Sequence, residues 1–304
     1  MNKTQRSELA RLLPDGIKFD CPMDRYTTFR VGGKAEAICF VNELSLLRQM
    51  VSYLSGVNIP YLIVGKGSNL LVKDGGVKGV VIILRGKLAS IGKSEERDEI
   101  LLAGGGLAIG DLLSYCSREG LAGLEFLAGI PGTAGGAVFM NAGAYAKDTG
   151  SMVQELLIVT DQGKPIVMTH SELQFSYRKS SIQKGMIIYG VKFRLEKKSR
   201  DKINRKIADY LKRRRASQPL DVPSGGSVFK NPPGDYAGRL IEDAGLKGQR
   251  IGGAVISPIH ANFIVNIGGA EAKDILMLMD LIRQKVKEKN GIELLPEIKV
   301  VGNS

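Results

Sequence analysis

The sequence predicts an α+β protein in two parts, and two patterns in it support this prediction. Short runs of β-branched and aliphatic residues alternate with amphipathic helical segments along the 304 residues. A charged segment at 197–202 then interrupts the alternation and is the best candidate for a boundary between two parts. Apolar residues make up 43% of the chain and charged residues 24%, which is the composition of a folded soluble protein.

The first third of the chain is predicted to combine strands with one helix. Leu47, Val51 and Leu54 share one face of that helix. Asn42 is expected to cap its start and Gly56 to close its end. The predicted strands are 35–41, 61–64 and 80–84. A glycine turn at 65–69 is predicted to follow the second of these strands.

The same alternation repeats on a larger scale between residues 85 and 200. The predicted elements are a strand, a glycine turn, a helix and two further strands: 100–103, 104–106, 109–116, 156–160 and 186–195. In the last strand apolar residues alternate with polar ones from Tyr189 to Glu196, so one of its faces is expected to contact water.

Beyond the charged segment an amphipathic helix is predicted, and it ends in the basic run Lys212–Arg215. Gly291 is expected to terminate a later, long helix. The elements predicted after the basic run are a loop or strand entrance, a short helix, a strand, the long helix and a final strand: 225–231, 237–244, 261–267, 275–291 and 297–301.

The net charge of +12 suits either a nucleic acid or a small polyanion such as a nucleotide. Lys212–Arg215 is the one dense basic run, but no aromatic residues are interleaved with it and no nucleic-acid-binding signature appears. Nucleic acid is therefore not the expected partner. Two interpretations of the run stay open, namely a solvated helix end and a basic rim for an anionic small molecule.

The cysteines and histidines do not predict a metal site. Cys21, Cys39 and Cys116 lack metal-type and CxxC spacing, and only two histidines are present. The cysteines are interpreted as reduced residues of a cytoplasmic protein. No apolar segment near the N-terminus resembles a signal peptide, and no membrane insertion is expected.

Phe126–Ala146 is the most informative stretch, because it carries no charge and contains five glycines. Its length and neutrality would suit a membrane span, but Pro131, Thr133 and Asn141 with the glycines leave no continuous apolar face. Glycine lets the backbone approach a ligand closely and lets successive N–H groups point into one concavity. The stretch therefore predicts a neutral cradle for a phosphate or pyrophosphate.

Two more glycine turns, Gly65–Asn69 and Gly104–Gly106, are further candidates for a phosphate site. Neither matches the Walker A or GxGxxG pattern, because the last glycine of the latter would fall on Leu70 or Ile109. Taken together, 64–72 and 127–144 resemble the FAD-binding domain of the vanillyl-alcohol oxidase and p-cresol methylhydroxylase superfamily.

This resemblance implies two small α+β subdomains, 25–84 and 85–197, that hold FAD between them, followed by a substrate-binding domain at 202–304. Neither His170 nor His260 lies in a flavin motif, so the FAD is expected to be non-covalent. The FAD-binding residues that the resemblance implies are Gly65, Gly67, Ser68, Asn69, Gly129, Ile130, Pro131, Gly132, Gly135, Gly136 and Asn141.

Three more motifs indicate which family of this superfamily the chain resembles: FSYR at 175–178, GGSVFKNP at 225–232 and LPE at 295–297. With the flavin motifs, they resemble the UDP-N-acetylenolpyruvoylglucosamine reductase family over nearly the whole chain. The resemblance implies that NADPH reduces FAD, which then reduces UDP-N-acetylglucosamine enolpyruvate to UDP-N-acetylmuramate in peptidoglycan precursor synthesis. Only residues 179–226 separate the FSYR arginine from the GGS serine, as in the shorter form of the family, which lacks an inserted segment with a tyrosine lid.

The family also implies the catalytic residues. Ser227 is expected to donate a proton to C2 of the substrate, and Arg178 and Glu297 to stabilise the enolate-like state that precedes this step. Glu297 is expected to be protonated, with a raised pKa, because an ionised carboxylate would repel the anionic substrate. Lys230 is a candidate source of positive charge near Ser227, which the serine hydroxyl would need in order to donate its proton.

Arg215 and Asn231 occupy positions that contact the nucleotide sugar in the family, although lysine is often found at the first of them. The chain is expected to act as a monomer. Two rival functions stay open: another flavin oxidoreductase of the same fold with oxygen as acceptor, and a nucleic-acid-binding module suggested by the charge.

Overall fold

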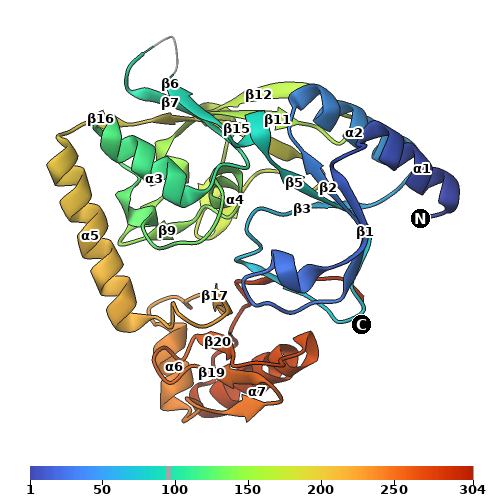
Figure 1. The fold of residues 1–304 in the computed structure, drawn as a ribbon. Coiled ribbons are helices and arrows are strands. Elements are labelled where there is room, and N and C mark those ends of the chain that lie inside the picture. Colours follow the sequence, from blue (N-terminus) through green and yellow to red (C-terminus); the bar gives the residue numbers. More distant parts are fainter. Residues whose placement is uncertain (94–96, 304) are drawn as a thin grey trace. The chain divides into compact units, whose positions relative to one another are not determined.

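The structure is a computed structural model that describes residues 1–93 and 97–303, and its chain divides into two compact units (Figure 1). The first unit comprises residues 1–19, 36–66 and 79–212, and the second comprises 20–35, 67–78 and 213–304. Both units combine helices with sheets, so the predicted α+β class is confirmed. The domain boundaries predicted at 84/85 and 197–202 stay predictions.

The first sheet of the first unit has the strand order β1-β2-β5-β3 and packs against two helices. Alternate residues of β2 and β5 are buried with the apolar face of α2, because successive strand side chains point to opposite faces of a sheet. The elements are α1 (Lys3–Leu12), β1 (Ile17–Pro22), β2 (Lys34–Val41), α2 (Leu44–Gly56), β3 (Tyr61–Ile63) and β5 (Val77–Leu84).

The predicted cap of α2 is wrong by one residue. The N-cap is Glu43, which has extended φ and ψ angles and makes no side-chain capping bond. Asn42 belongs to the preceding loop, where its carbonyl oxygen accepts a hydrogen bond from Lys87 N at 3.0 Å. Asn42 therefore lies outside the helix, which begins at Leu44.

The second sheet of the first unit is antiparallel, with the order β12-β11-β15-β7-β6, and α3 and α4 share one core with it (Figure 1). The prediction that alternate residues of β15 contact water holds for Arg194 but is wrong for Gly190, which is buried against Leu157 of β11. The elements are β6 (Ile91–Lys93), β7 (Ile100–Gly104), α3 (Ile109–Arg118), α4 (Ala134–Phe139), β11 (Val153–Val159), β12 (Pro165–Thr169) and β15 (Ile187–Arg194).

Short strand pairs and 3₁₀ turns complete the first unit. The pairs are β8 (Leu121–Ala122) with β16 (Glu196–Lys197), β9 (Gly143–Ala144) with β10 (Lys147–Asp148), and β13 (Phe175–Ser176) with β14 (Lys179–Ser180). The 3₁₀ turns are η2 (Gly86–Ala89), η3 (Glu125–Leu127), η4 (Gly150–Met152) and η5 (His170–Glu172).

Helix α5 (Arg200–Ser217) begins in the first unit, and its last residues belong to the second. Ile203 and Tyr210, two of the apolar residues that predicted this helix, are buried in the first unit.

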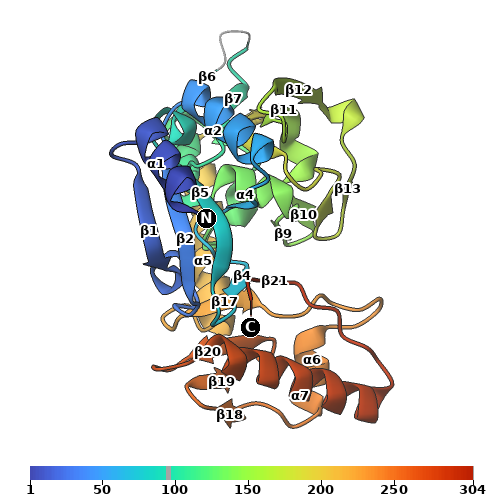
Figure 2. The ribbon, with the colours of Figure 1, turned by 90° about the vertical axis from the view of Figure 1, so that its right-hand side faces the viewer.

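The second unit has an antiparallel sheet, β17-β20-β19-β18, with α6 and α7 beside it (Figure 2). Its elements are η1 (Met23–Tyr26), β4 (Leu70–Val72), β17 (Ser224–Ser227), α6 (Ala237–Asp243), β18 (Arg250–Ile251), β19 (Ala254–Ile256), β20 (Phe263–Asn266), α7 (Ala272–Asn290) and β21 (Lys299–Val301).

Two long-range contacts tie the early segment 67–78 into the second unit. β4 pairs in parallel with β21, so that Leu70 lies opposite Lys299. The carboxylate of Asp74 accepts hydrogen bonds from the N–H groups of Ala272 at 2.8 Å and Lys273 at 3.0 Å, at the start of α7. The helix ends, as predicted, at Gly291, which is left-handed with φ of 69°.

Over the part of the chain that the structure describes, none of the helices combines the length and apolar character that a membrane crossing requires.

Candidate functional site

The Gly65 turn and the long glycine run meet within the first unit. A Cβ atom at Gly65 would lie 2.6 Å from Oγ1 of Thr133, so only glycine allows this approach. Thr133 is the N-cap of α4, and the same Oγ1 accepts a hydrogen bond from Gly136 N at 3.3 Å. The predicted two sides of a phosphate cradle are therefore in contact at this point.

The N–H groups of the glycine run divide into two sets. Those of Ala134 and Gly135 donate to backbone carbonyl groups at 2.8 and 2.9 Å, so they hold α4 in place. Gly129 is exposed and Gly132 is partly exposed, and within the described residues neither N–H group has a hydrogen-bond partner. The donors that an anion can reach thus precede α4, and Gly129 adopts φ of 76°.

The third glycine turn, Gly104–Gly106, is explained by packing. Cβ atoms there would lie 2.5 Å from Leu88 O, 2.0 Å from Ile188 O and 2.4 Å from Leu84 O. These glycines allow backbone to pack directly on backbone, so the turn needs no ligand to account for its composition.

Arg178 lies in the two-residue turn between β13 and β14. Its φ of 55° is left-handed, a conformation that is strained for a non-glycine residue and is often found at functional sites. The side chain is half-buried, and Cζ lies 5.2 Å from the centroid of the Tyr177 ring. The hairpin is fixed to the end of α4 by a bond from Ser180 Oγ to Phe139 O at 2.8 Å.

A second bond to the Arg178 hairpin comes from Asn141, at the end of the glycine run. Its Nδ2 donates to Ser176 O at 3.0 Å, and its Oδ1 accepts from Gly150 N at 2.8 Å. The residue is 2% exposed and has φ of 42°. Both ends of this amide, which was predicted to contact FAD, are therefore bonded to the protein, and they link the glycine run to the arginine turn.

Ser227 and Glu297 lie on neighbouring segments of the second unit. Ser227 ends β17 and pairs with Phe263 of β20. Directly after it, Val228 O accepts a hydrogen bond from Glu297 N at 2.7 Å. Both residues are half-buried. Two predicted catalytic residues that are far apart in sequence are thus brought together, whereas Arg178 belongs to the first unit.

The segment Gly67–Asn69 lies beside this pair. Asn69 Nδ2 donates to Glu297 O at 3.2 Å, and Ser68 O is the nearest atom, at 4.0 Å, to a Cβ atom built on Gly226. Gly67 has φ of 62° and packs on the backbone of Tyr26. The second half of the predicted flavin turn therefore approaches the predicted catalytic residues of the second unit.

Packing and backbone conformation explain the two glycines before Ser227. A Cβ atom at Gly225 would lie 2.1 Å from Cε2 of Phe29, a ring that is fully buried. Gly226 has φ of 77°, which disfavours any residue with a side chain. The GGS motif is therefore required by the local structure as well as by any chemistry of the serine.

The sequence did not predict a role for Asn262, which precedes β20. Its Oδ1 accepts from Phe229 N at 2.9 Å, its Nδ2 donates to Phe229 O at 2.8 Å, and the residue is 3% exposed. One signal was available, because an asparagine within the apolar run 261–267 must find partners when it is buried.

The predicted substrate contacts are more exposed. Arg215 is exposed on α5, and Lys230 is half-buried, with its N–H bonded to Leu295 O at 2.9 Å. Asn231 Oδ1 accepts from Ala237 N at 3.1 Å, at the start of α6. The Asn231 side chain therefore satisfies an N–H group that has no partner within the helix, in addition to any contact with a ligand.

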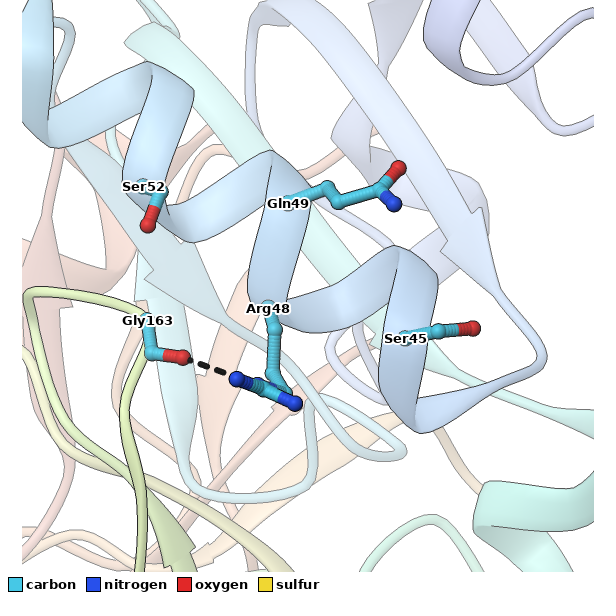
Figure 3. Close-up of a pocket in the computed structure, with 5 residues that line it drawn as sticks. All are labelled: Ser45, Arg48, Gln49, Ser52 and Gly163. Atoms are coloured by element: carbon cyan, nitrogen blue, oxygen red, sulfur yellow. Dashed lines mark hydrogen bonds between the residues drawn. The ribbon is translucent and has the colours of Figure 1, made fainter.

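A surface hollow of about 470 Å³ lies elsewhere in the first unit (Figure 3). Its lining residues are Ser45, Arg48, Gln49, Ser52 and Gly163. Arg48 Nε donates to Gly163 O at 3.2 Å, and Ser52 Oγ donates to Gln162 O at 2.9 Å. These bonds join α2 to the turn between β11 and β12, and none of the predicted site residues lines the hollow.

The described residues contain no cluster of histidine, cysteine, aspartate and glutamate that could hold a metal ion. All three cysteines are free and buried, and burial raises the pKa of Cys39 and of Cys116 to about 12. Burial also lowers the pKa of His260. Its Nδ1 accepts a hydrogen bond from Asn262 N at 3.2 Å, which requires that nitrogen to be unprotonated.

Two family models match the chain. A model described as FAD binding domain matches residues 35–169, and one described as UDP-N-acetylenolpyruvoylglucosamine reductase, C-terminal domain, matches residues 218–301. The predicted FAD-binding domain is therefore confirmed. The first match contains Gly65 and the glycine run, and the second contains Ser227 and Glu297.

Individual relatives cover nearly the whole chain. A UDP-N-acetylenolpyruvoylglucosamine reductase of Caldanaerobacter subterraneus subsp. tengcongensis is 40% identical over 297 residues, which are 97% of each chain. One of Clostridium kluyveri is 39% identical over 95% of this chain and 94% of its own. The crystal structure of the reductase (MurB) of Thermus caldophilus matches with a TM-score of 0.79 and 37% identity, over 92% of this chain and 97% of that one. The chain therefore belongs to the UDP-N-acetylenolpyruvoylglucosamine reductase family.

Proposed function

We propose that this protein uses NADPH and FAD to reduce UDP-N-acetylglucosamine enolpyruvate to UDP-N-acetylmuramate, a step of peptidoglycan precursor synthesis. Family membership supports the overall reaction. The proposed catalytic roles of Ser227 and Glu297 are supported by the hydrogen bond from Glu297 N to Val228 O, which holds the backbone of Glu297 next to that of Ser227.

The first unit fits a bound FAD at the glycine motifs. Gly65 allows the turn to pack directly on Thr133, where a Cβ atom would lie 2.6 Å from Oγ1, and the N–H groups of Gly129 and Gly132 are donors for a pyrophosphate. When bound, FAD supplies hydride transfer from NADPH to C3 of the enolpyruvyl group. We propose that it is held without a covalent bond, and that Ser68 and Asn69 take part in holding it.

The substrate develops negative charge at C2 and in its carboxylate as it accepts hydride, and the proposed catalytic residues act on this charge. The planar guanidinium of Arg178 suits bidentate pairing with a carboxylate. Glu297, held protonated, donates a hydrogen bond to the same group, and Ser227 Oγ delivers the proton to C2. Lys230, three residues after the serine, adds positive charge that favours loss of the serine proton.

The sugar nucleotide carries a diphosphate, for which we propose Arg215 in the basic end of α5. The side chain of Arg214, its neighbour, donates from Nη1 to Gln218 Oε1 at 3.2 Å. Arg215 is the more exposed of the two. Asn231 is proposed to contact the nucleotide sugar through Nδ2, because its Oδ1 is occupied at the start of α6.

Anaerobic spectroscopy of the purified protein tests the reaction. The protein is expected to be yellow, to lose its flavin absorbance on addition of NADPH, and to regain it when UDP-N-acetylglucosamine enolpyruvate is added. Reoxidation by oxygen or a quinone but not by the sugar nucleotide would support another flavin oxidoreductase. A colourless protein with salt-sensitive DNA or RNA binding would support the nucleic-acid-binding module.

The two half-reactions separate the proposed roles. Ser227→Ala is expected to leave reduction by NADPH near the wild-type rate and to slow oxidation by the sugar nucleotide by about 10²–10⁴-fold, the usual contribution of a general acid. Ser224→Ala, in the same strand, is the matched control and is expected to change neither rate. Equal slowing of both half-reactions by Ser227→Ala would remove the serine from the acid role.

Glu297 is tested by a graded pair of variants. Glu297→Gln is expected to be milder than Glu297→Ala, because an amide can still donate a hydrogen bond. Two equally inactive variants would instead indicate proton transfer by Glu297.

A further inference from the structure

The short segment between Ser227 and Lys230 has an unusual set of backbone partners. The ladder between β17 and β20 stops at the pair Ser227–Phe263. Beyond this pair, Val228 N still donates to Asn262 O at 2.8 Å. At Phe229 a side chain replaces the backbone partner. Asn262 Oδ1 accepts a hydrogen bond from Phe229 N at 2.9 Å, and Asn262 Nδ2 donates one to Phe229 O at 2.8 Å.

The opposite edge of the same segment is bonded to the chain segment that contains Leu295 and Glu297. Val228 O accepts from Glu297 N at 2.7 Å, and Lys230 N donates to Leu295 O at 2.9 Å. Every backbone donor and acceptor of Val228 and Phe229 is therefore bonded, on one side to Asn262 and on the other to Glu297 or its neighbours. The orientation of these peptides sets the position of Ser227 relative to Glu297.

The Asn262 amide lies where water does not compete with it. Asn262 is 3% exposed, Phe229 is 1% exposed and Val228 is fully buried. Loss of the amide would leave two buried backbone groups without partners, and the peptide at Phe229 would rotate to find others. A displacement of about 1 Å at reacting groups is enough to slow a catalysed step by about 100-fold.

We propose that Asn262 is a positioning residue that holds the Ser227 backbone in register with Glu297 and so aligns the proton donor with the group that stabilises the enolate. The inference rests on the proposed function. Asn262 is not proposed to touch the reacting atoms. It acts through the backbone of Phe229 and Val228.

Three variants test the proposal in the FAD-loaded protein. Asn262→Ala removes both side-chain bonds, and Asn262→Asp keeps the shape and the acceptor for Phe229 N but loses the donor to Phe229 O. Asn266→Ala is the matched control, because Asn266 is also buried in this region but bonds to Phe29 O at 3.0 Å and Gly268 N at 2.9 Å.

Stopped-flow measurement of the half-reactions is the first readout. Both Asn262 variants are expected to keep the rate of reduction by NADPH within about threefold and to lose about 100-fold in the limiting rate of oxidation by the sugar nucleotide. The half-saturating substrate concentration is expected to change by less than about fivefold, because no substrate contact is removed. The Asn266→Ala protein is expected to keep both limiting rates.

Amide hydrogen exchange of residues 226–231 is the second readout, and it needs no substrate. Exchange of the Phe229 N–H group is expected to rise by at least about tenfold in Asn262→Ala, which loses its acceptor, to rise less in Asn262→Asp, which keeps an acceptor, and to stay unchanged in the Asn266 variant. Unchanged exchange, wild-type oxidation rates in a folded Asn262 variant, or equal slowing of both half-reactions would each overturn the proposal. If wild-type protein itself is not reoxidised by the sugar nucleotide, the proposed function fails, and the exchange measurement still decides whether Asn262 holds the segment.

Discussion

Replacing Asn141 tests whether its side-chain amide connects the glycine run to the Arg178 turn. In Asn141→Ala the buried Gly150 N–H loses its partner, at a cost of about 2 kcal/mol, and the loss of the bond to the more exposed Ser176 carbonyl costs about 0.5–1 kcal/mol. Alanine at φ of 42° adds about 1 kcal/mol of backbone strain. The free energy of unfolding is therefore expected to fall by about 3–4 kcal/mol.

Two further variants separate these contributions. Asn141→Gly loses the same two bonds but tolerates the left-handed backbone, so its loss is expected to be smaller than that of Asn141→Ala, at about 2–3 kcal/mol. Ser180→Ala removes the other bond to the hairpin, which is exposed, and is expected to cost less than about 1 kcal/mol.

Urea-induced unfolding followed by circular dichroism measures the loss of stability, and amide hydrogen exchange of residues 173–182 measures the hold on the hairpin. The Asn141 variants are expected to exchange faster there and to be slower in oxidation by the sugar nucleotide, because Arg178 is less well held. A loss below about 1 kcal/mol in Asn141→Ala, together with unchanged exchange in the hairpin, would show that the Asn141 amide does not hold the hairpin.

The remaining predictions concern glycine, cysteine and histidine positions. Gly226→Ala is expected to lower the free energy of unfolding by about 1–2 kcal/mol through backbone strain alone. Gly225→Ala is expected to lower it more, because its Cβ meets the buried ring of a phenylalanine. Equal melting temperatures for the two variants would contradict this order. The thiols of Cys39 and Cys116, whose pKa values burial raises to about 12, are expected to stay unlabelled by a thiol reagent at pH 8 until the protein is denatured, as mass spectrometry would show. Burial lowers the pKa of His260 below 6.5, so the unfolded chain binds the proton more readily and stability is expected to fall as pH drops below about 6.5. The melting temperature of His260→Gln should therefore depend less on pH between 7 and 5; an identical slope would show that other groups carry the effect.

The sequence predicted most of the long elements because their apolar spacing is local information. The buried face of α2 and the strands β2, β5 and β15 follow from residues a few positions apart. The helix α1 was missed, since it is mostly polar and buries one leucine, although Asn2 and Gln5 form a capping box that could have indicated it. Short strands such as β4 and β19, each of three residues, were missed because they are too short to show a period.

The candidate residues of the site were predicted by motif, whereas their neighbours were not. No spacing within the sequence relates Asn141 to the Arg178 hairpin or Asn262 to Phe229. The bonding partners of these asparagines become recognisable only in the fold, where each buried amide must find partners inside the protein, and the partners are backbone atoms that carry no sequence signal. The bond between Asn231 and the first N–H group of α6 was missed for the same reason.

By itself, the sequence determined the α+β class, the neutral glycine run and the motifs that mark the family. Glycine and apolar periodicity act over a few residues, so these features can be read without a fold. The tertiary structure alone decided that Gly65 packs on Thr133 and that the Ser227 segment pairs with the Glu297 segment. Such contacts depend on the register of strands and the closure of long loops, because segments far apart in the chain meet only once the surrounding core has formed.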